Sequence, residues 1–426
     1  MPPADHPLRA ELNHEIHARP SESLSAPVRI SYLALSSDGV AREEEWQHVL
    51  TLAKNYGAEV PASPANHYSA DLGDFAMRWE RHAEFTRYTF FARCIGDIFA
   101  STALDRVPSH WVDAMPGRVL VATHGGIVDQ QELVGGVEAA STRWFDGNVL
   151  VGSSVADKAA IALTDFRVRG DGFSRFLVLD QSLTPRQAGR TVQRILEIDT
   201  YRMMALLALP IARELAPIIQ VAESDLSACM SRLEQAEQSD ESTLLDSLTQ
   251  LGARIERWDA QHSYRFSASA AYYELVQRRI AELREVRITG VQTFGEFTER
   301  RLAPAMNTCR AIARRQESLA QRIARANQLL TTRVDISVER QNQALLESMN
   351  RRAKAQFKLQ QTVEGLSVAA ITYYVVGLIG YAAKALHQRG YNVDYEWVEG
   401  LSIPIVLVLI GTGTYLLKHR VTRHFR

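Results

Sequence analysis

The spacing of apolar positions divides the chain into parts with different secondary structure. Over residues 1–182, short runs rich in β-branched and aromatic residues alternate with Gly and Asp turns, a pattern typical of strands. The predicted strands include APVRISYLAL, GRVLVATHGGIVD, NVLVGSSVADKAAIALTDFRV and FSRFLVLD. After the first of them, REEEWQHVLTLAKNYG has an acidic first turn and Gly57 as a stop, which predicts a helix. We therefore expect a mixed α/β domain in this part.

Three short motifs of this domain predict turns or exposed edges. VRGDGFSR predicts a hairpin loop, because Gly170 and Gly172 can adopt positive φ. THGGIVD invites a phosphate-binding interpretation, but it lacks the GxxxxGK[ST] spacing and a following helix, so we expect a turn. In WERHAEF, strand spacing places Glu80, His82 and Glu84 on one face, and polar residues on such a face usually contact solvent.

From Thr184-Pro185 onward the pattern becomes helical, and residues 183–362 are expected to form a stalk of long helices. Leu, Ala, Arg, Gln and Glu dominate this part, and glycines are few. The apolar run MMALLALPIA is too short to cross a bilayer, so we expect a buried helix segment there. Kinks or turns are predicted at Pro210, Pro217, EQSDES, ITGVQTFG and Pro304.

The last stalk helix is predicted to run without interruption from about residue 316 to 386, because this stretch contains no proline. Its apolar positions recur at a mean step of about 3.7 residues, which favours straight or slightly right-handed packing. A helix of about 70 residues is roughly 100 Å long and cannot bury its own apolar stripe. It therefore needs neighbouring helices, other subunits or both. The stripe consists of Leu319, Ile323, Ala326, Leu330, Val334, Val338, Leu345 and Met349.

Two uncharged apolar stretches near the carboxyl end, Gly365 to Ala383 and Gly400 to Leu417, are each long enough to cross a hydrocarbon core of about 30 Å. Two buried core helices are the alternative, but charged flanks and nearby aromatic residues favour membrane spans. We expect transmembrane helices at residues 363–386 and 400–417, a short external loop at 387–399 and a basic tail at 418–426.

Basic residues gather on one side of these two spans. The connector, Lys384 to Glu399, has more acidic than basic residues. By the positive-inside rule, both termini are expected to be cytoplasmic and the connector external. The flanking basic residues are Arg351, Arg352, Lys354 and Lys358 before the first span, and Lys418, Arg420, Arg423 and Arg426 after the second.

Composition narrows the function classes further. The formal net charge is -1, from 48 basic and 49 acidic residues, so no bulk positive field points to nucleic acid. Cys94, Cys229 and Cys309 form no CxxC pair, which argues against a disulfide framework or zinc ribbon and fits a reducing compartment. The start, MPPADHPLRA, has no apolar signal-peptide region, so we expect the bulk of the chain in the cytoplasm.

This layout resembles the CorA-type metal ion transporters, which are homopentamers whose long stalk helix continues into a pore-lining span. The likeness in sequence is confined to about the last 80 residues. The hallmark of those transporters is a Gly-Met-Asn triplet that closes the first span. Here GLIGYAA keeps Gly377 and Gly380, but Tyr381 and Ala382 replace the methionine and asparagine. The resemblance thus implies a pore-like layout without the amide that holds a hydrated divalent cation.

The chain more closely resembles a bacterial family of predicted membrane-anchored proteins with a domain of unknown function. Three segments carry this resemblance: LNHEIHARP, RVDISVERQNQALLESMNRRA and LQQTVEGLSVAAITYYVVGLIGY. It implies an anchor in the bacterial inner membrane and supplies no activity.

The segment ELNHEIHARP is the first candidate for chemistry. If it is helical, His14 and His17 lie about one turn apart, and His124 could be a third metal ligand if the fold brought it close. Zincins instead have HExxH, with histidines four apart and a glutamate that acts on the metal-bound water. We favour the alternative, a docking element that Pro20 ends. No catalytic residue and no cofactor is expected.

A polar face on the first span is the second candidate, because such a face suits a helix that lines a pore or meets a partner helix. In the stalk, Gln341 and Asn342 interrupt the apolar stripe, either at the axis of an oligomer or where the packing partner changes. The predicted face of the span consists of Glu364, Ser367, Tyr374, Gly377, Gly380, Tyr381 and Lys384.

Two function classes follow from these observations. The first is a membrane-anchored, homo-oligomeric scaffold or sensor that is not an enzyme. The second is a CorA-like, pore-forming channel or transporter that lacks the Gly-Met-Asn triplet. The expected partners are the lipid bilayer and further copies of the chain, associated through the stalk and the spans. The sequence does not decide whether the protein also binds an inorganic ion or a small ligand. Binding of nucleic acid is not expected.

Overall fold

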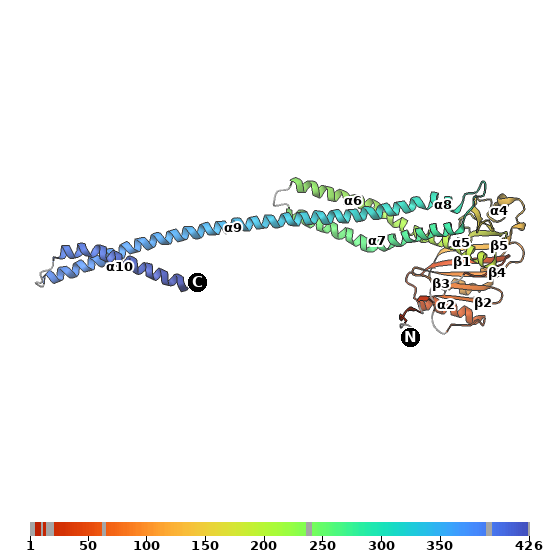
Figure 1. The fold of residues 1–426 in the computed structure, drawn as a ribbon, viewed down its shortest axis with the longest axis horizontal. Coiled ribbons are helices and arrows are strands. Elements are labelled where there is room, and N and C mark those ends of the chain that lie inside the picture. Colours follow the sequence, from red (N-terminus) through yellow and green to blue (C-terminus); the bar gives the residue numbers. More distant parts are fainter. Residues whose placement is uncertain are drawn as a thin grey trace. The chain divides into compact units, whose positions relative to one another are not determined.

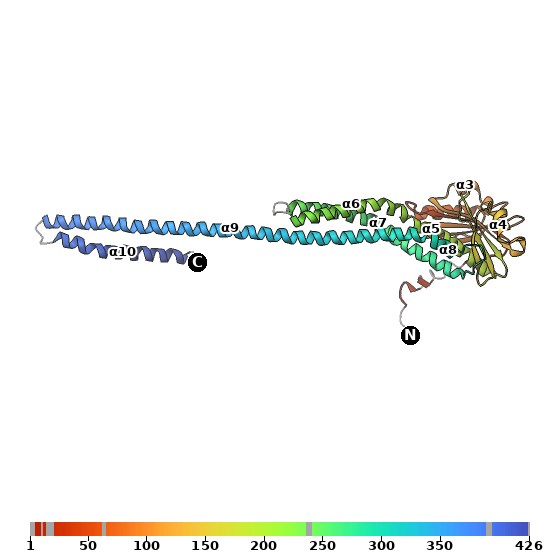
Figure 2. The same ribbon diagram turned by 90° about the horizontal axis from the view of Figure 1, so that it is seen from above.

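A computed structural model describes residues 5–9, 12–13, 21–61, 65–235, 241–388 and 394–424 of the chain, which divides into two units. The first unit contains Met1–Ala236 and Thr243–Asn327, and the second contains Glu237–Ser242 and Gln328–Arg426. Figures 1 and 2 show the elements of both units from two directions.

The first unit contains an eight-stranded sheet with the strand order β2-β3-β4-β1-β5-β8-β7-β6. The paired strands are antiparallel, except for β5 and β8, which are parallel. This mixed sheet, flanked by helices, confirms the predicted α/β class. The strands are β1 (Val28–Ser36), β2 (His67–Asp71), β3 (Ala76–Arg81), β4 (Phe85–Arg93), β5 (Arg118–Asp129), β6 (Val151–Val155), β7 (Ala160–Thr164) and β8 (Ser174–Asp180).

One face of the sheet is apolar and packs against short helices. Trp46 of helix α2 meets Trp79 of β3 with ring centroids 5.5 Å apart, and Trp111 of α3 lies in the same core cluster. Trp144 of α4 belongs to a second cluster with Leu177 of β8. Burial of large aromatic side chains makes this face the main apolar core of the sheet. The short helices are α2 (Arg42–Asn55), α3 (Ser109–Asp113), α4 (Gly136–Trp144) and the 3-10 turns η1 (Leu104–Arg106) and η2 (Gln130–Glu132).

The opposite face of the sheet is more polar and packs against α5 (Pro185–Leu206). The hydroxyl oxygen of Tyr32 is 2.7 Å from Oγ1 of Thr200, and the Thr123 hydroxyl donates to Oδ2 of Asp199 at 3.0 Å. Because Tyr32 and Thr123 are paired across β1 and β5, α5 lies over the middle of the sheet.

The motif THGGIVD lies inside strand β5, so the expected turn is wrong. The strand pairs with β1 and β8 through Gly125 and Gly126. A Cβ at Gly125 would come within 1.9 Å of the Phe176 ring, and one at Gly126 within 2.3 Å of Ile98. The two glycines therefore make room for neighbouring side chains and form no phosphate-binding loop.

The motif WERHAEF forms a hairpin, so the expectation of one polar, solvent-facing strand face is also wrong. Strand β3 ends at Arg81 and β4 begins at Phe85, which interrupts the alternation between them. Glu80 is only 2 % exposed, and the Glu84 carboxylate accepts a hydrogen bond of 2.6 Å from Arg265 of helix α7 (Glu241–Leu283).

The hairpin loop predicted for VRGDGFSR is confirmed, because this segment connects the antiparallel strands β7 and β8. Gly172 has a φ of 85°, as expected for a position that favours glycine. Gly170 does not use this freedom, since it is not among the glycines with positive φ.

The change to helix at Thr184 is confirmed, and Thr184 forms a capping box at the start of α5. The run MMALLALPIA lies across the end of α5 and the start of α6, with Met204 and Ala208 buried, as predicted. Pro217 lies inside α6 and does not end it. The longest helix begins before the predicted residue 316. The long helices are α6 (Ala208–Gln235), α7 (Glu241–Leu283), α8 (Phe294–Arg301) and α9 (Ala303–Gln388).

Helices α6, α7 and the first part of α9 form a bundle in the first unit. Arg315 of α9 donates to Glu223 of α6 at 2.7 Å, and Gln316 of α9 donates to Asp259 of α7 at 3.1 Å. Ile323 of α9 is 2 % exposed. The start of the predicted apolar stripe is therefore covered by neighbouring helices of the same chain.

In the second unit, the last part of α9 and α10 (Tyr395–His424) form a helical hairpin, and both views show them side by side (Figures 1 and 2). By length and composition, three helical stretches among the described residues could cross a membrane: Pro185–Gln235, Ala303–Gln388 and Glu396–Leu416. The two carboxy-terminal stretches were predicted, whereas the first was expected to be too short.

Candidate functional site

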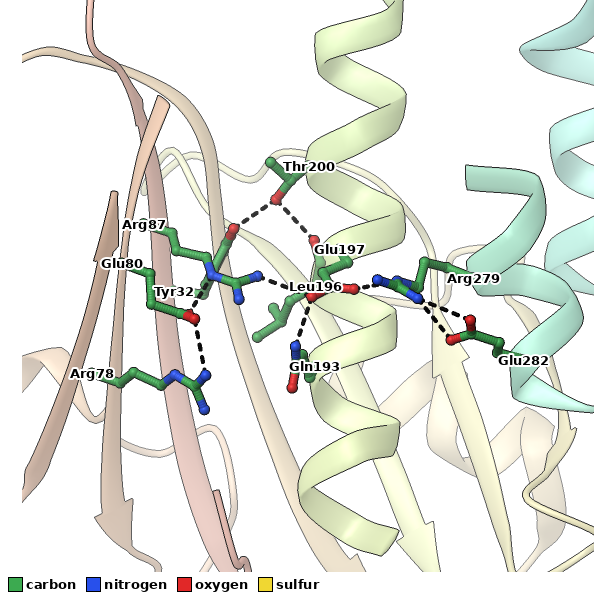
Figure 3. A network of polar contacts seen from close by, with 10 residues as sticks. All are labelled: Tyr32, Arg78, Glu80, Arg87, Gln193, Leu196, Glu197, Thr200, Arg279 and Glu282. Carbon is green, nitrogen blue, oxygen red and sulfur yellow. Dashed lines mark hydrogen bonds and ion pairs between the residues drawn. The ribbon is translucent and has the colours of Figure 1, made fainter. Parts of the chain in front are cut away.

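A buried network of charges lies between the polar face of the sheet and the long helices (Figure 3). Arg87 of β4 donates through Nε to Glu80 of β3 at 2.5 Å and through Nη1 to Glu197 of α5 at 3.2 Å. Arg78 of β3 donates to the other carboxylate oxygen of Glu80 at 2.9 Å. These three strand residues alternate with aromatic ones, so their side chains share the face that α5 covers.

The network continues from α5 into α7. Glu197 accepts hydrogen bonds from Arg279 of α7 and from Gln193, the latter at 2.8 Å. Arg279 also donates to Glu282 at 2.9 Å, and Arg194 of α5 donates to Glu282 at 3.2 Å. Charged groups thus connect the sheet, α5 and α7, and we call the set Arg78, Glu80, Arg87, Arg194, Glu197, Arg279 and Glu282 the charged junction.

The charged junction keeps Glu80 and Arg87 ionised. Burial by itself would raise the pKa of Glu80, but the guanidinium groups of Arg87 and Arg78 outweigh burial and lower that pKa to about 2. Burial would lower the pKa of Arg87, yet Glu80 and Glu197 raise it above its usual value. For Tyr32, which lines the same region, burial raises the pKa. All three groups therefore keep one protonation state at neutral pH.

The space inside the junction is small. A cavity of about 30 Å³ lies beside Arg78, Glu80, Arg87 and Tyr32. That volume is about the share of one water molecule in the liquid. Because each carboxylate already accepts hydrogen bonds from arginines, the arrangement holds three elements together, and this inner cavity offers little room for a ligand.

His124, the predicted third metal ligand, lies in strand β5 and contacts Phe173 and Ser31. Its ring stacks on Phe173 at 3.9 Å, and its Nδ1 lies 2.9 Å from the Ser31 hydroxyl. Burial lowers the pKa of His124 to about 4. His14 and His17 lie outside the described residues. Within the part of the chain that the structure describes, no three His, Cys, Asp or Glu side chains form a metal-binding group.

The predicted polar face of the first span does not point at α10. The buried positions of α9 near α10 are Thr372, Val376 and Ala383, together with Gly380. A Cβ at Gly380 would come within 2.9 Å of the Glu399 carboxyl carbon, so this glycine allows close packing within the hairpin. Only Gly380, of the predicted face, lies on this side.

The other predicted positions of this face are open in the single chain. Tyr374 is 71 % exposed and Tyr381 is 78 % exposed, and Gly377 is half-buried. Whichever surface this face meets, it is not α10. The remaining exposed members are Glu364, Ser367 and Lys384.

The charged junction was missed in the sequence, although a signal for it exists. The segments AMRWER and FTRYTFFAR place Arg78 and Arg87 among apolar and aromatic residues. A charged residue in the middle of an aromatic strand is almost never fully buried without a partner. Arg87 therefore indicated that a buried partner exists. The sequence could not identify this partner as Glu197, because Glu197 is more than 100 positions away from Arg87.

The fold and these sites define a class of protein: an α/β unit, long helices and an apolar helical hairpin. Residues 4–421 match the family described as Protein of unknown function (DUF3422), and the chain belongs to this family. None of the curated proteins matches the chain.

Proposed function

We propose that the protein is a membrane-anchored scaffold or sensor, with the hairpin of α9 and α10 in the bacterial inner membrane and the first unit in the cytoplasm. The observation that carries the proposal is the exposure of apolar side chains in the hairpin. Leu366, Leu378 and Leu409 are each at least 65 % exposed. Monomeric soluble proteins rarely expose contiguous apolar surfaces of this kind, whereas lipid covers them favourably.

The apolar stretch that begins at Pro185 has a different environment. Its buried residues include Met204, Ala212, Leu215 and Ile219, which lie within the first unit. A helix covered by its own protein does not need lipid to bury its apolar face. This difference supports two spans rather than three.

The orientation of the hairpin follows from the distribution of basic residues. Arg351 and Lys358 precede the first span, and the sequence after the second span contains four further basic residues, whereas the connector carries Asp394 and Glu396. The positive-inside rule places the basic flanks in the cytoplasm. Both chain ends and the first unit then lie on the cytoplasmic side.

Labelling of introduced cysteines tests this topology. Asp394→Cys in the connector should react with a membrane-impermeant maleimide in intact cells, and Gln343→Cys in the stalk should react only after lysis. The unchanged chain, with its own Cys94, Cys229 and Cys309, measures the background. Labelling of Gln343→Cys in intact cells, or extraction of the chain by alkaline carbonate without detergent, would contradict the proposal.

The scaffold or sensor role rests on the charged junction. Arg87 pairs with Glu197 between the sheet and α5, and Glu197 pairs with Arg279 between α5 and α7. Such a junction can transmit a displacement of the sheet to the helices, because it links rigid elements through paired charges. Replacement of α9 residues 365–388 and α10 by an unrelated two-span anchor should preserve this role. Loss of function with intact membrane placement would refute it.

A pore-forming protein with CorA-like layout is the second candidate. The observation that favours it is the continuity of α9, which runs as one helix from the first unit through the predicted first span. A pore predicts ion flux through liposomes that contain the purified protein, and that flux should respond to Tyr381→Ala. Liposomes without flux for monovalent and divalent cations or anions would exclude this candidate.

A further inference from the structure

An apolar stripe on α9 stays uncovered after the helix leaves the bundle of the first unit. Val338, Leu345, Met349, Leu359 and Val363 are each at least half exposed. At about 100° per residue, these positions lie within a narrow sector of the helix. We call these residues the open stripe.

The open stripe has a charged face opposite to it. Arg340, Glu347, Arg351 and Lys358 project from the other side of the helix when about 3.6 residues make one turn. A solvated single helix would not need this division into two faces. The pattern is that of a helix with one side against a partner.

The open stripe continues in line into the predicted membrane span. Residues 18 apart are separated by about five turns and face the same way. Leu345 is thereby aligned with Val363 and Tyr381, and Met349 is aligned with Ser367. Tyr374 and Tyr381 are open on this side, whereas α10 covers the opposite side of α9.

The continuity of this face limits which partner can cover it. Lipid cannot cover Val338 to Leu359, because this segment lies outside the predicted span. A soluble protein cannot reach Tyr374 or Tyr381 inside the membrane, and a tyrosine hydroxyl without a partner is unfavourable in hydrocarbon. The occupant must itself be a helix that extends from the bilayer into the cytoplasm by about 25 residues, or roughly 40 Å.

We infer that the open stripe binds the same stripe of a second copy of this chain, with the two α9 helices parallel and in register. This inference rests on the proposed membrane anchor, because the bilayer holds all copies at one depth. A second copy necessarily has a helix of the required length, running in the same direction and at the same depth. Residues of the same number therefore meet across the interface.

Polar positions within the stripe fit this arrangement. Gln341 and Asn342 interrupt the apolar positions near their middle, and amides of equal number can bond to each other in register. Arg352 lies in the same sector, so parallel copies bring like charges together and weaken the contact at that level. Arg352→Leu should therefore strengthen the association.

Disulfide formation between single cysteines tests the inference in native membranes. In chains whose Cys94, Cys229 and Cys309 are replaced by alanine, Leu345→Cys lies in the open stripe and Glu347→Cys on the charged face. A disulfide needs Cα atoms within about 7 Å. Mild oxidation should give covalent dimers of Leu345→Cys at least about tenfold more than of Glu347→Cys. Arg352→Leu combined with Leu345→Cys should raise the dimer fraction further.

Equal dimer fractions for the two cysteines, or a disulfide of Leu345→Cys to a different polypeptide, would overturn the inference. Membrane fractionation of the same variants separates it from the proposed function. If the chain remains in the membrane but Leu345→Cys forms no preferred dimer, the anchor stands and the self-association fails. If the chain is soluble without detergent, the proposed anchor fails, and the register argument fails with it.

Discussion

Two apolar helical regions of this protein have similar hydropathy but different surroundings. The stretch in Pro185–Gln235 and the one in Glu396–Leu416 have mean hydropathies of 1.5 and 1.6, so composition does not distinguish them. In the first, 33 % of the apolar window is buried, and in the second 11 %. The comparison teaches that hydropathy shows how much apolar surface a helix has, whereas tertiary packing decides whether protein or lipid must cover it.

The largest expected effect concerns a charge placed in the covered region. Ile219→Arg puts an unpaired charge at a side chain with 0 % exposure, which should lower the free energy of unfolding of the first unit by more than about 4 kcal/mol. Val221→Arg, at a side chain of the same helix that is 59 % exposed, should change it by less than about 0.5 kcal/mol. Urea denaturation in detergent, followed by tryptophan fluorescence, measures both.

These two variants test whether protein or lipid covers α6. If α6 were in lipid, Ile219→Arg would change the membrane association of the chain and leave the unfolding of the sheet unaltered. An unchanged unfolding curve for Ile219→Arg would show that packing of this part of α6 against other protein segments does not stabilise the first unit.

The next effect concerns the charged junction. Glu197→Leu removes the carboxylate that Arg87 and Arg279 share. Because Arg87 keeps Glu80 and Arg279 keeps Glu282, we expect a cost of about 3 kcal/mol, the lower end for loss of a buried partner. Glu223→Leu removes the partly exposed pair with Arg315 and should cost at most about 1 kcal/mol. Equal losses for the two variants, measured by urea denaturation, would mean that the junction is no tighter than a surface ion pair.

A pH effect of similar or smaller size is expected from His124. Its pKa is about 4 in the folded chain, below the ordinary value of 6.5, because burial disfavours the imidazolium ion. The unfolded chain therefore binds the proton first as pH falls, and stability that is complete above pH 6.5 declines between about 6.5 and 4. The decline attributable to His124 is up to about 3 kcal/mol.

His124→Gln should remove this part of the pH dependence, and the exposed His110→Gln should leave it unchanged. The measurement is the free energy of unfolding of the full chain in detergent at several pH values between 4 and 7. An identical pH profile for His124→Gln and the unchanged chain would show that this imidazole is protonated equally in both states.

The last pair of variants compares a covered and an exposed position of one helix, and its exposed member has the smallest expected effect. Ile323 and Leu345 both belong to the predicted apolar stripe of α9, but Ile323 is 2 % and Leu345 60 % exposed. Ile323→Ala should destabilise the first unit by about 2–5 kcal/mol, because it leaves a cavity. Leu345→Ala should change the unfolding of the first unit by less than about 0.5 kcal/mol. A large effect of Leu345→Ala would mean that the stripe is already covered within a single chain.

Much of the fold could be predicted from local sequence patterns, because these patterns depend on residues close together in the chain. The helix that begins after Thr184, the hairpin of VRGDGFSR and the long α9 all follow from capping residues, glycines or the lack of proline over a few turns. The errors occurred where a distant partner overrides the local pattern. Gly125 and Gly126 look like a turn, but Phe176 and Ile98 require the small residues inside a strand.

The candidate site was predictable only in part for the same reason. The face with Tyr374 and Tyr381 could be read from helical spacing, but that α10 lies on its opposite side could not. Glu80 was expected in solvent because its face looked polar, and it is buried because Arg87 neutralises it. Nothing near Glu80 in sequence indicated that Glu197 would contact the same arginine.

The amino-acid sequence is enough to predict the order of the parts: an α/β region, long helices and two apolar stretches near the carboxyl end. It could do so because hydrophobic spacing, caps and breakers act over a few residues along the chain. Only the tertiary structure decided which apolar and charged side chains are covered, such as Ile219 and Glu197, and which are open, such as Leu345. Burial is a property of contacts between residues that are far apart in the chain, and no local pattern specifies them.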